Sequence, residues 1–584
     1  MVDPFWHTGI ITVYCNSSTI ESQFLRKSLS HPRTGIENAK ECPSHGPQEH
    51  RLHPYRTYHM SERVHRSVMN IKVGMLFYIL SLFLAFFSRK VFLDCLGAEF
   101  IGLTGMLMNI MSFLSVAELG IGTSIAYFLY KPLQEDNHEK INEVMSILAY
   151  LYRCIGFFIG GIGVIVSIFF PWWFSNISEG LPLVYFAFYS FLASTISFYL
   201  FNYKQLLVSA NQKQYLISAY FHTINIFQSL TQLVLAYYYR NLYLWVVVGF
   251  IFTIIGIIIF NYRIRQLYPW LQISLKEGRK NLRQYPEVLM KTRQVFIQKM
   301  KDFILYRCDE LLVGIFVSIT QVAFYGNYTI IINKMVFLVN ILTDGLSAGV
   351  GNLLAEGNEK NTMKVFWEMM ATRFLIMGMV IFSLIMFIQP FISCWVGHQY
   401  LLNDTIIYLL LFHLFLRPQF VTVYVFIGSA GLYSDVWTSW TELVINIIVT
   451  LCLAPFYGII GILLGKIISM FFFNIIWKPY YLFKEGFHKS VWDYWRPMIT
   501  YYGLFFIFAS LSVIIRYFII ESYVDSWITL IGIGVLIYPA LMLLYFLSLF
   551  VFTRGMKYFV ARSPFAYNLV NRISPHTKTN SIDI

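Results

Sequence analysis

The chain has 584 residues, of which 57% are hydrophobic and 18% aromatic, and its mean hydropathy is +0.59. Only 13% of the residues are charged, whereas a soluble domain has about 25%. This composition excludes an ordinary soluble protein and predicts a chain embedded in lipid. The formal net charge is +13, but the basic residues fall in short loops between apolar runs. We therefore expect attraction to anionic membrane lipid and no nucleic-acid partner.

The N-terminal segment 1–69 differs from the rest of the chain. Residues 1–59 are rich in Ser, Pro, His and Arg and have no helical periodicity, so we predict that they are unstructured. A second explanation is that translation starts at Met60 or Met69, which intact-mass analysis would decide. The first apolar run begins near Ile71 and is too long for a cleavable signal, so we interpret it as a transmembrane helix.

Long apolar runs dominate the remaining sequence. A helix needs about 20 apolar residues to cross a hydrocarbon core of about 30 Å. Fourteen segments meet this requirement, so we predict an all-α polytopic membrane protein with about 14 transmembrane helices. Their approximate limits are 71–93, 101–130, 143–170, 182–202, 215–238, 243–262, 295–316, 323–348, 365–392, 403–427, 437–454, 459–477, 498–516 and 527–552.

The distribution of lysine and arginine predicts the orientation of these helices, because short cytoplasmic loops retain positive charge. With the N-terminus inside, the even-numbered loops and the C-terminal tail hold 23 basic residues, whereas the odd-numbered loops hold one, Arg240. One missed helix would invert every later loop, so we predict an even number of helices with both termini cytoplasmic. The longest inner loop is 263–294, and its apolar spacing from Leu271 to Val288 is typical of an amphipathic segment on the inner face.

The two halves of the chain match weakly but in order. Phe100–Gly102 corresponds to Phe324–Gly326 and Arg153 to Arg373, at offsets between 219 and 229 residues. Chance alignment of apolar sequence is the alternative. Two six-helix copies must share one orientation, which is typical of parallel transporter repeats with a substrate site between them. We divide the chain into an extension (1–69), a first bundle (70–262), a basic cytoplasmic linker (263–294), a second bundle (295–482), two further helices (483–552) and a cytoplasmic tail (553–584).

Basic residues inside the apolar runs are candidates for a binding site. Each costs about 2.5–3.5 kcal/mol on insertion scales, so it needs a partner, a cavity or a function. Arg89, Arg153 and Arg373 lie near helix ends, where snorkelling to the headgroups and a cavity role are both open. Arg417 and Lys466 lie nearer to mid-helix, which favours a water-filled cavity.

Acidic residues inside the runs are candidates for ion coupling. They are Glu118, Asp309 and Glu310. Asp309 and Glu310 could equally form a structural pair with Arg307 or with a neighbouring helix.

Enzyme signatures are absent from the sequence. The outward loops are all about eleven residues or shorter, and no HExxH, GxSxG or GxxxxGK[ST] motif occurs. The spacing of Cys42, His45, His50 and His53 fits no standard zinc site. We therefore predict a protein that is not an enzyme and that needs no metal or cofactor.

Several short motifs occur along the membrane region between about residues 70 and 550. They are Arg89–Gly102, Ala117–Gly122, Leu129–Leu133, Cys308–Gly314, Tyr325–Tyr328, Gly431–Tyr433 and Tyr457–Gly461. In combination they resemble the Wzx-type polysaccharide flippases of the MATE-like MOP superfamily, which export O-antigen, capsule and exopolysaccharide units. The sequence departs from that pattern at Lys466, where relatives usually have a small polar residue, and in its N-terminal extension.

The resemblance implies a V-shaped pair of six-helix bundles around a central cavity, with two extra C-terminal helices. It implies a cargo of oligosaccharide linked through pyrophosphate to a polyprenol, moved to the outer leaflet of a bacterial inner (plasma) membrane for surface polysaccharide such as lipopolysaccharide. Partners to expect are membrane lipid, a coupling H⁺ or Na⁺, and a polysaccharide polymerase complex. The physical reading agrees, because a pyrophosphate needs counter-charge in a low dielectric and the excess Arg and Lys supplies it.

Two other functions remain open on the sequence. A drug or cation antiporter of the same superfamily would prefer an acidic and aromatic cavity, whereas basic residues dominate here. A polysaccharide polymerase or glycosyltransferase would need a sizeable outer loop to hold its acceptor.

Overall fold

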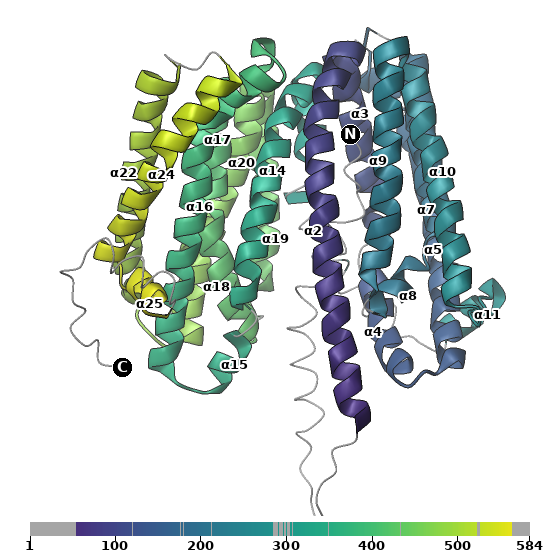
Figure 1. Ribbon diagram of the computed structural model, residues 1–584, viewed down its shortest axis with the longest axis horizontal. Helices are drawn as coiled ribbons and strands as arrows, with labels where there is room; N and C mark the ends of the chain where they lie inside the picture. The colour runs from purple at the N-terminus through teal and green to yellow at the C-terminus, as the bar shows by residue number, and fades with distance from the viewer. Residues whose placement is uncertain are drawn as a thin grey trace, which may run out of the picture. The chain divides into compact units, whose positions relative to one another are not determined.

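The computed structural model describes residues 54–118, 121–175, 177–178, 180–211, 213–283, 308–347, 350–432, 434–521 and 526–562, with isolated positions between 290 and 305. The chain divides into two compact units, residues 1–303 and 304–584, which we describe separately. Helices make up both units, and no strand occurs among the described residues (Figure 1).

The first unit is built on long helices that pack in pairs, α2 with α9, α5 with α7, and α10 with both α7 and α9 (Figure 1). Shorter helices lie between them. The elements are α2 (Pro54–Leu96), α3 (Ala98–Leu114), η1 (Ser115–Glu118), α4 (Ile121–Gln134), α5 (His138–Ser167), α6 (Phe170–Trp173), α7 (Leu181–Phe201), α8 (Gln205–Ala210), α9 (Gln214–Tyr239), α10 (Leu242–Leu267) and α11 (Leu275–Leu282).

Local sequence explains where several of these helices begin. The side chains of Asn137 and Asn241 accept hydrogen bonds from the backbone N–H groups of Lys140 and Leu244, both at 3.0 Å, and so cap α5 and α10. Gly180 adopts φ +81° immediately before α7, a left-handed conformation that a residue with a Cβ rarely takes. The turns of this unit are therefore encoded locally.

The second unit centres on α16, which packs against α14, α17, α18, α22, α24 and α25. The elements are α13 (Asp309–Phe316), α14 (Ile319–Ser347), α15 (Val350–Ala355), α16 (Glu359–Trp395), η2 (His398–Tyr400), α17 (Asp404–Phe415), α18 (Arg417–Ser429), α19 (Val436–Tyr457), α20 (Ile459–Met470), the π-helix η3 (Phe471–Trp477), α21 (Lys478–Tyr481), the π-helix η4 (Leu482–Gly486), α22 (Trp492–Ile515), the π-helix η5 (Arg516–Ile520), α24 (Trp527–Phe552) and α25 (Arg554–Arg562).

Helices α19 and α20 form the closest antiparallel pair of the second unit. Gly458 reverses the chain between them at φ +57°. A methyl group on Gly461 would overlap the backbone of Leu453, and one on Gly465 would overlap the hydroxyl of Thr450. This GxxxG spacing lets the two backbones approach closely, as small residues do in membrane helix pairs.

Among the described residues, 11 helices are long and apolar enough to cross a membrane. The predicted all-α polytopic fold is confirmed, whereas the figure of 14 spans remains a prediction. The fifth predicted span corresponds to α9, which is long enough but less apolar because Gln228 and Gln232 line its buried face. The second predicted span is divided into α3, η1 and α4, and much of the first half of the seventh lies outside the described residues.

Two further expectations concern the N-terminal segment. Helix α2 begins at Pro54, so residues 54–59, which we expected to be unstructured, are helical. Extending an existing helix gains one hydrogen bond for each residue fixed, and Pro is favoured at a first helical position. Residues 1–53, including the Cys42 and His45 segment, lie outside the described part of the chain.

Candidate functional site

The most buried charge pair among the predicted site residues joins α20 to α13. The Lys466 ammonium forms an ion pair with the Asp309 carboxylate, and the side chains are 7% and 20% exposed. The Tyr325 hydroxyl on α14 donates a hydrogen bond of 3.2 Å to the same carboxylate. Asp309 occupies the first turn of α13, where the helix dipole stabilises negative charge. The positive charge of Lys466 is therefore neutralised within the protein.

A second cation and a histidine lie beside this pair. Arg417 begins α18 directly before a proline, and it is half-buried. His413, in the last turn of α17, is buried. Helix α17 packs against both α20, which carries Lys466, and α18, which begins with Arg417. The structure therefore brings two predicted cations and one unpredicted histidine to a single place in the second unit, which we call the basic cluster.

A stripe of buried polar residues runs along α19 from this region toward α21. The Asn474 amide donates a 2.7 Å hydrogen bond to the Glu442 carboxylate, and the Lys478 ammonium lies 2.6 Å from the Asp435 carboxylate. The spacing of three or four residues places the stripe on one face of α19, toward α20, η3 and α21. Its members are Asp435, Thr438, Glu442, Asn446 and Thr450, all at most 5% exposed.

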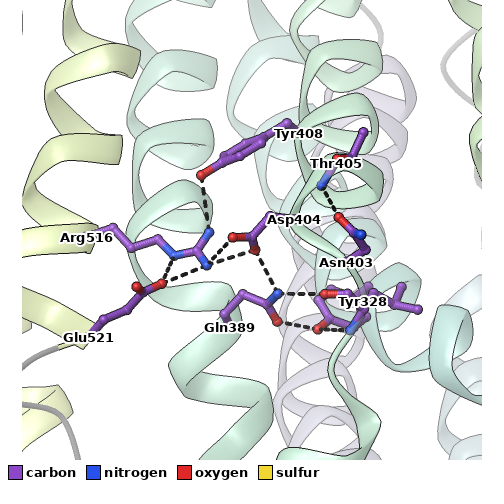
Figure 2. A network of polar contacts seen from close by, with 9 residues as sticks. Tyr328, Gln389, Asn403, Asp404, Thr405, Tyr408, Arg516 and Glu521 are labelled. Carbon is purple, nitrogen blue, oxygen red and sulfur yellow. Dashed lines mark hydrogen bonds and ion pairs between the residues drawn. The ribbon is translucent and has the colours of Figure 1, made fainter.

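A polar network ties η5, at the end of α22, to α17 and α16 in the second unit (Figure 2). The Arg516 guanidinium donates hydrogen bonds of 2.8 and 2.9 Å to both oxygens of Asp404 and one of 3.0 Å to Glu521. The Gln389 amide donates to Asp404 at 3.0 Å and to the Leu402 carbonyl at 2.8 Å. We call this network the Arg516 clamp.

The first unit holds one of the predicted acids in an enclosed position. Glu118 ends η1, and its carboxylate accepts hydrogen bonds from the hydroxyls of Tyr152 on α5 and Tyr199 on α7, the latter at 2.8 Å. Both tyrosines are buried. A carboxylate held by two neutral hydroxyl donors can gain or lose a proton without breaking an ion pair with them.

The remaining predicted residues are dispersed. Arg89 on α2 and Arg373 on α16 are buried, at 6% and 4% exposure, whereas Arg153 on α5 is exposed. Arg153 and Arg373 correspond in the predicted repeat, yet their environments differ. Glu310 is half-buried beside Asp309.

The sequence analysis missed three residues that the structure makes prominent. Glu442 and Arg516 are charges inside predicted spans, so the criterion that selected Lys466 would also have found them. His413 has no such signal, because a lone histidine in an apolar run is more often a packed side chain than part of a site. A surface cavity of about 540 Å³ lies apart from these charges, between α7 and α10, with Tyr185, Tyr189 and Phe250 in its lining.

No protein-family model and no curated protein matches the sequence. The lipid II flippase MurJ, in an inward closed conformation, matches with a TM-score of 0.56 and 16% identity, over 82% of this chain and 99% of MurJ. An inward-facing MATE-family multidrug resistance transporter of the MOP superfamily matches with a TM-score of 0.46 and 13% identity, over 69% of this chain and 95% of its own. The MATE transporter VcmN of Vibrio cholerae gives 0.41 and 14%, over 70% and 95%. The chain is therefore a multi-pass membrane protein that shares its fold with MurJ over most of its length.

Proposed function

We propose that the chain is a transporter that flips polyprenyl-pyrophosphate-linked oligosaccharide from the inner to the outer leaflet of a bacterial plasma membrane, for surface polysaccharide biosynthesis. The observation that carries this proposal is the basic cluster of His413, Arg417 and Lys466 beside Asp309, within apolar helices. A fold shared with a lipid II flippase supports a lipid-linked cargo.

The chemistry of the cargo fits this cluster. A pyrophosphate carries negative charge into a low dielectric, where an arginine fork can hold its oxygens in pairs. Half-buried Arg417 supplies such a fork, and His413 can add a hydrogen-bond donor. The polyprenol tail can stay in lipid while the headgroup crosses. Arg89, Arg153 and Arg373 are further candidate contacts along the path.

Coupling to an ion follows from the Lys466–Asp309 pair. While Asp309 is ionised it neutralises Lys466. A proton on Asp309 would release the ammonium to bind an anion, so proton entry and cargo binding would favour each other. Sodium would instead have to displace an ammonium from the carboxylate, so we propose that H⁺ is the coupling ion. Glu118 in the first unit and Glu310 are the other acids that we propose for proton transfer.

Complementation of a flippase-null strain tests the proposal, with surface polysaccharide, membrane abundance and inner-leaflet lipid-linked precursor measured together. Arg417→Ala should reduce polysaccharide about tenfold or more, because a lost charge-assisted contact costs about 1.5–3 kcal/mol. Arg417→Lys should restore only part of it, since lysine lacks the fork. Lys90→Ala, an exposed charge on α2, is the control and should remain active.

Lys466 is tested without leaving its acid partner unpaired. The double variant Lys466→Met with Asp309→Asn removes both charges of the pair together, so it should reach normal abundance but lose transport. Full polysaccharide in both the Arg417→Ala strain and this double-variant strain, at normal abundance, would contradict the proposal. It would reopen the drug-exporter alternative.

A further inference from the structure

Each unit carries a short amphipathic helix that docks on a long helix through a glycine. In the first unit, α11 packs against α5, and a methyl group on Gly278 would overlap the carbonyl oxygen of Ser146. In the second unit, α25 packs against α16, and a methyl group on Gly555 would overlap the carbonyl oxygen of Trp367. Figure 1 shows each short helix beside its long partner.

The two docking points are equivalent. Ser146 is the ninth residue of α5, and Trp367 is the ninth residue of α16. Both long helices begin after an asparagine cap, Asn137 and Asn358. The offset between the docking points also falls within the range of the repeat predicted from sequence. The same element therefore occurs twice, once in each unit, although two extra helices precede α25.

Specific contacts that involve none of its charged side chains hold α11 on α5. The backbone N–H groups of Gln272 and Ser274 donate hydrogen bonds to Asn142 Oδ1 and Ser146 Oγ, at 3.0 and 3.1 Å. Trp270 stacks on His138 with ring centroids 3.8 Å apart. The position of α11 on α5 is therefore built from specific contacts and does not depend on its charge.

Both helices expose a basic face. On α11 the exposed face carries Lys276, Arg279 and Lys280 and continues to Arg283, at helical spacings of three and four residues. On α25, Arg554, Lys557 and Arg562 are exposed, whereas Met556 and Val560 are buried. Arg562 also lies 3.5 Å from Glu368. Clusters of exposed Lys and Arg at the cytoplasmic surface of a membrane attract the headgroups of anionic lipids.

The docking points also fix the depth of these helices along the predicted spans. Ser146 and Trp367 lie close to the first residues of the predicted spans 143–170 and 365–392, where headgroups meet hydrocarbon. Lipid phosphates occupy that level, so they are the anions that these exposed basic faces meet in the bilayer. We propose that α11 and α25 are a pair of equivalent binding elements for the headgroups of anionic phospholipids in the bilayer.

Native mass spectrometry of the purified full chain tests this proposal, with phosphatidylglycerol titrated against phosphatidylcholine in mixed micelles. We compare the triple variant Lys276→Gln, Arg279→Gln and Lys280→Gln, the α25 variant Arg554→Gln with Lys557→Gln, and both combined. The matched control is Lys140→Gln with Lys360→Gln, which removes exposed charges from the first turns of α5 and α16.

Each helix variant should lower the preference for phosphatidylglycerol by about fivefold for each charge removed, and the combined variant should lose most of it. The control should retain it. An unchanged preference in the combined variant, or an equal loss in the control, would overturn the proposal. Displacement of the lipid by millimolar inorganic phosphate would also overturn it. So would a combined variant that loses bound RNA but keeps its preference for phosphatidylglycerol. Because the readout is lipid binding, failure here is distinct from failure of the flippase proposal.

Discussion

At the scale of single residues, Arg516 shows what a buried charge requires. Its side chain is 4% exposed, and two carboxylates from different elements, Asp404 and Glu521, neutralise it. Breaking a fully buried pair costs about 3–5 kcal/mol, but these carboxylates are 42% and 39% exposed, so we expect Arg516→Leu to cost about 2 kcal/mol. Thermal unfolding in detergent measures the loss.

Two further variants serve as comparisons for Arg516→Leu. One changes the same residue, and the other changes an arginine on α22. Arg516→Lys should give an intermediate loss, because one ammonium cannot reproduce a guanidinium that reaches Asp404 and Glu521 through two different nitrogens. Arg496→Ala, an exposed arginine on α22, should change stability by less than about 0.5 kcal/mol. An Arg516→Leu protein as stable as the Arg496→Ala protein would show that the clamp does not hold the end of α22.

The sequence identified charged residues inside apolar runs, but it could not identify the residues that pair with them. Insertion cost alone selected Asp309 and Lys466, because any ionised group in an apolar run is expensive. Their pairing depends on the packing of α13 against α20, which joins positions more than 150 residues apart. Pairing at that separation has no local signal, so only the fold could supply Lys466 as the partner of Asp309.

At the scale of elements, the glycine contacts predict how tightly the amphipathic helices are held. Gly278→Ala adds a methyl group against the Ser146 carbonyl, so α11 must shift. Overpacking of this kind costs about 1–3 kcal/mol. We expect faster proteolysis of the 263–294 segment and a lower unfolding temperature. Gly161→Ala on α5 is the control: nothing lies near its added methyl group, and alanine favours a helix, so stability should hold or rise. Equal behaviour of the two variants would contradict tight docking.

Helix positions were largely predictable from apolar periodicity, whereas interruptions within helices were not. Predicted limits such as 182–202 and 527–552 differ from α7 and α24 by at most one residue at either end. The tenth predicted span is divided at Leu416, where α17 ends and α18 begins. The proline after Arg417 was a local signal for that break, since the residue before a proline is biased away from the helical region. The amphipathic character of α11 was predicted, but α25 was assigned to a tail.

At the scale of the whole molecule, duplication is the simplest account of the matched features. The basic cluster, the α19 stripe and the Arg516 clamp all belong to the second unit, whereas Glu118 with its two tyrosines belongs to the first. We therefore predict that the two halves are copies that diverged in their buried charge while keeping the docked amphipathic helix.

The orientation of the whole chain is the assumption on which both proposals depend, and it has a direct test. Basic residues number 23 on the predicted inner side and one on the outer side, which favours cytoplasmic termini. In a background without native cysteines, Lys280→Cys on α11 should react with an impermeant maleimide only in inside-out vesicles. Gln399→Cys, exposed in the loop after α16, should react in intact cells. The reverse pattern would place α11 at the outer leaflet, where it could not meet inner-leaflet lipid, and would invert the proposed direction of flipping.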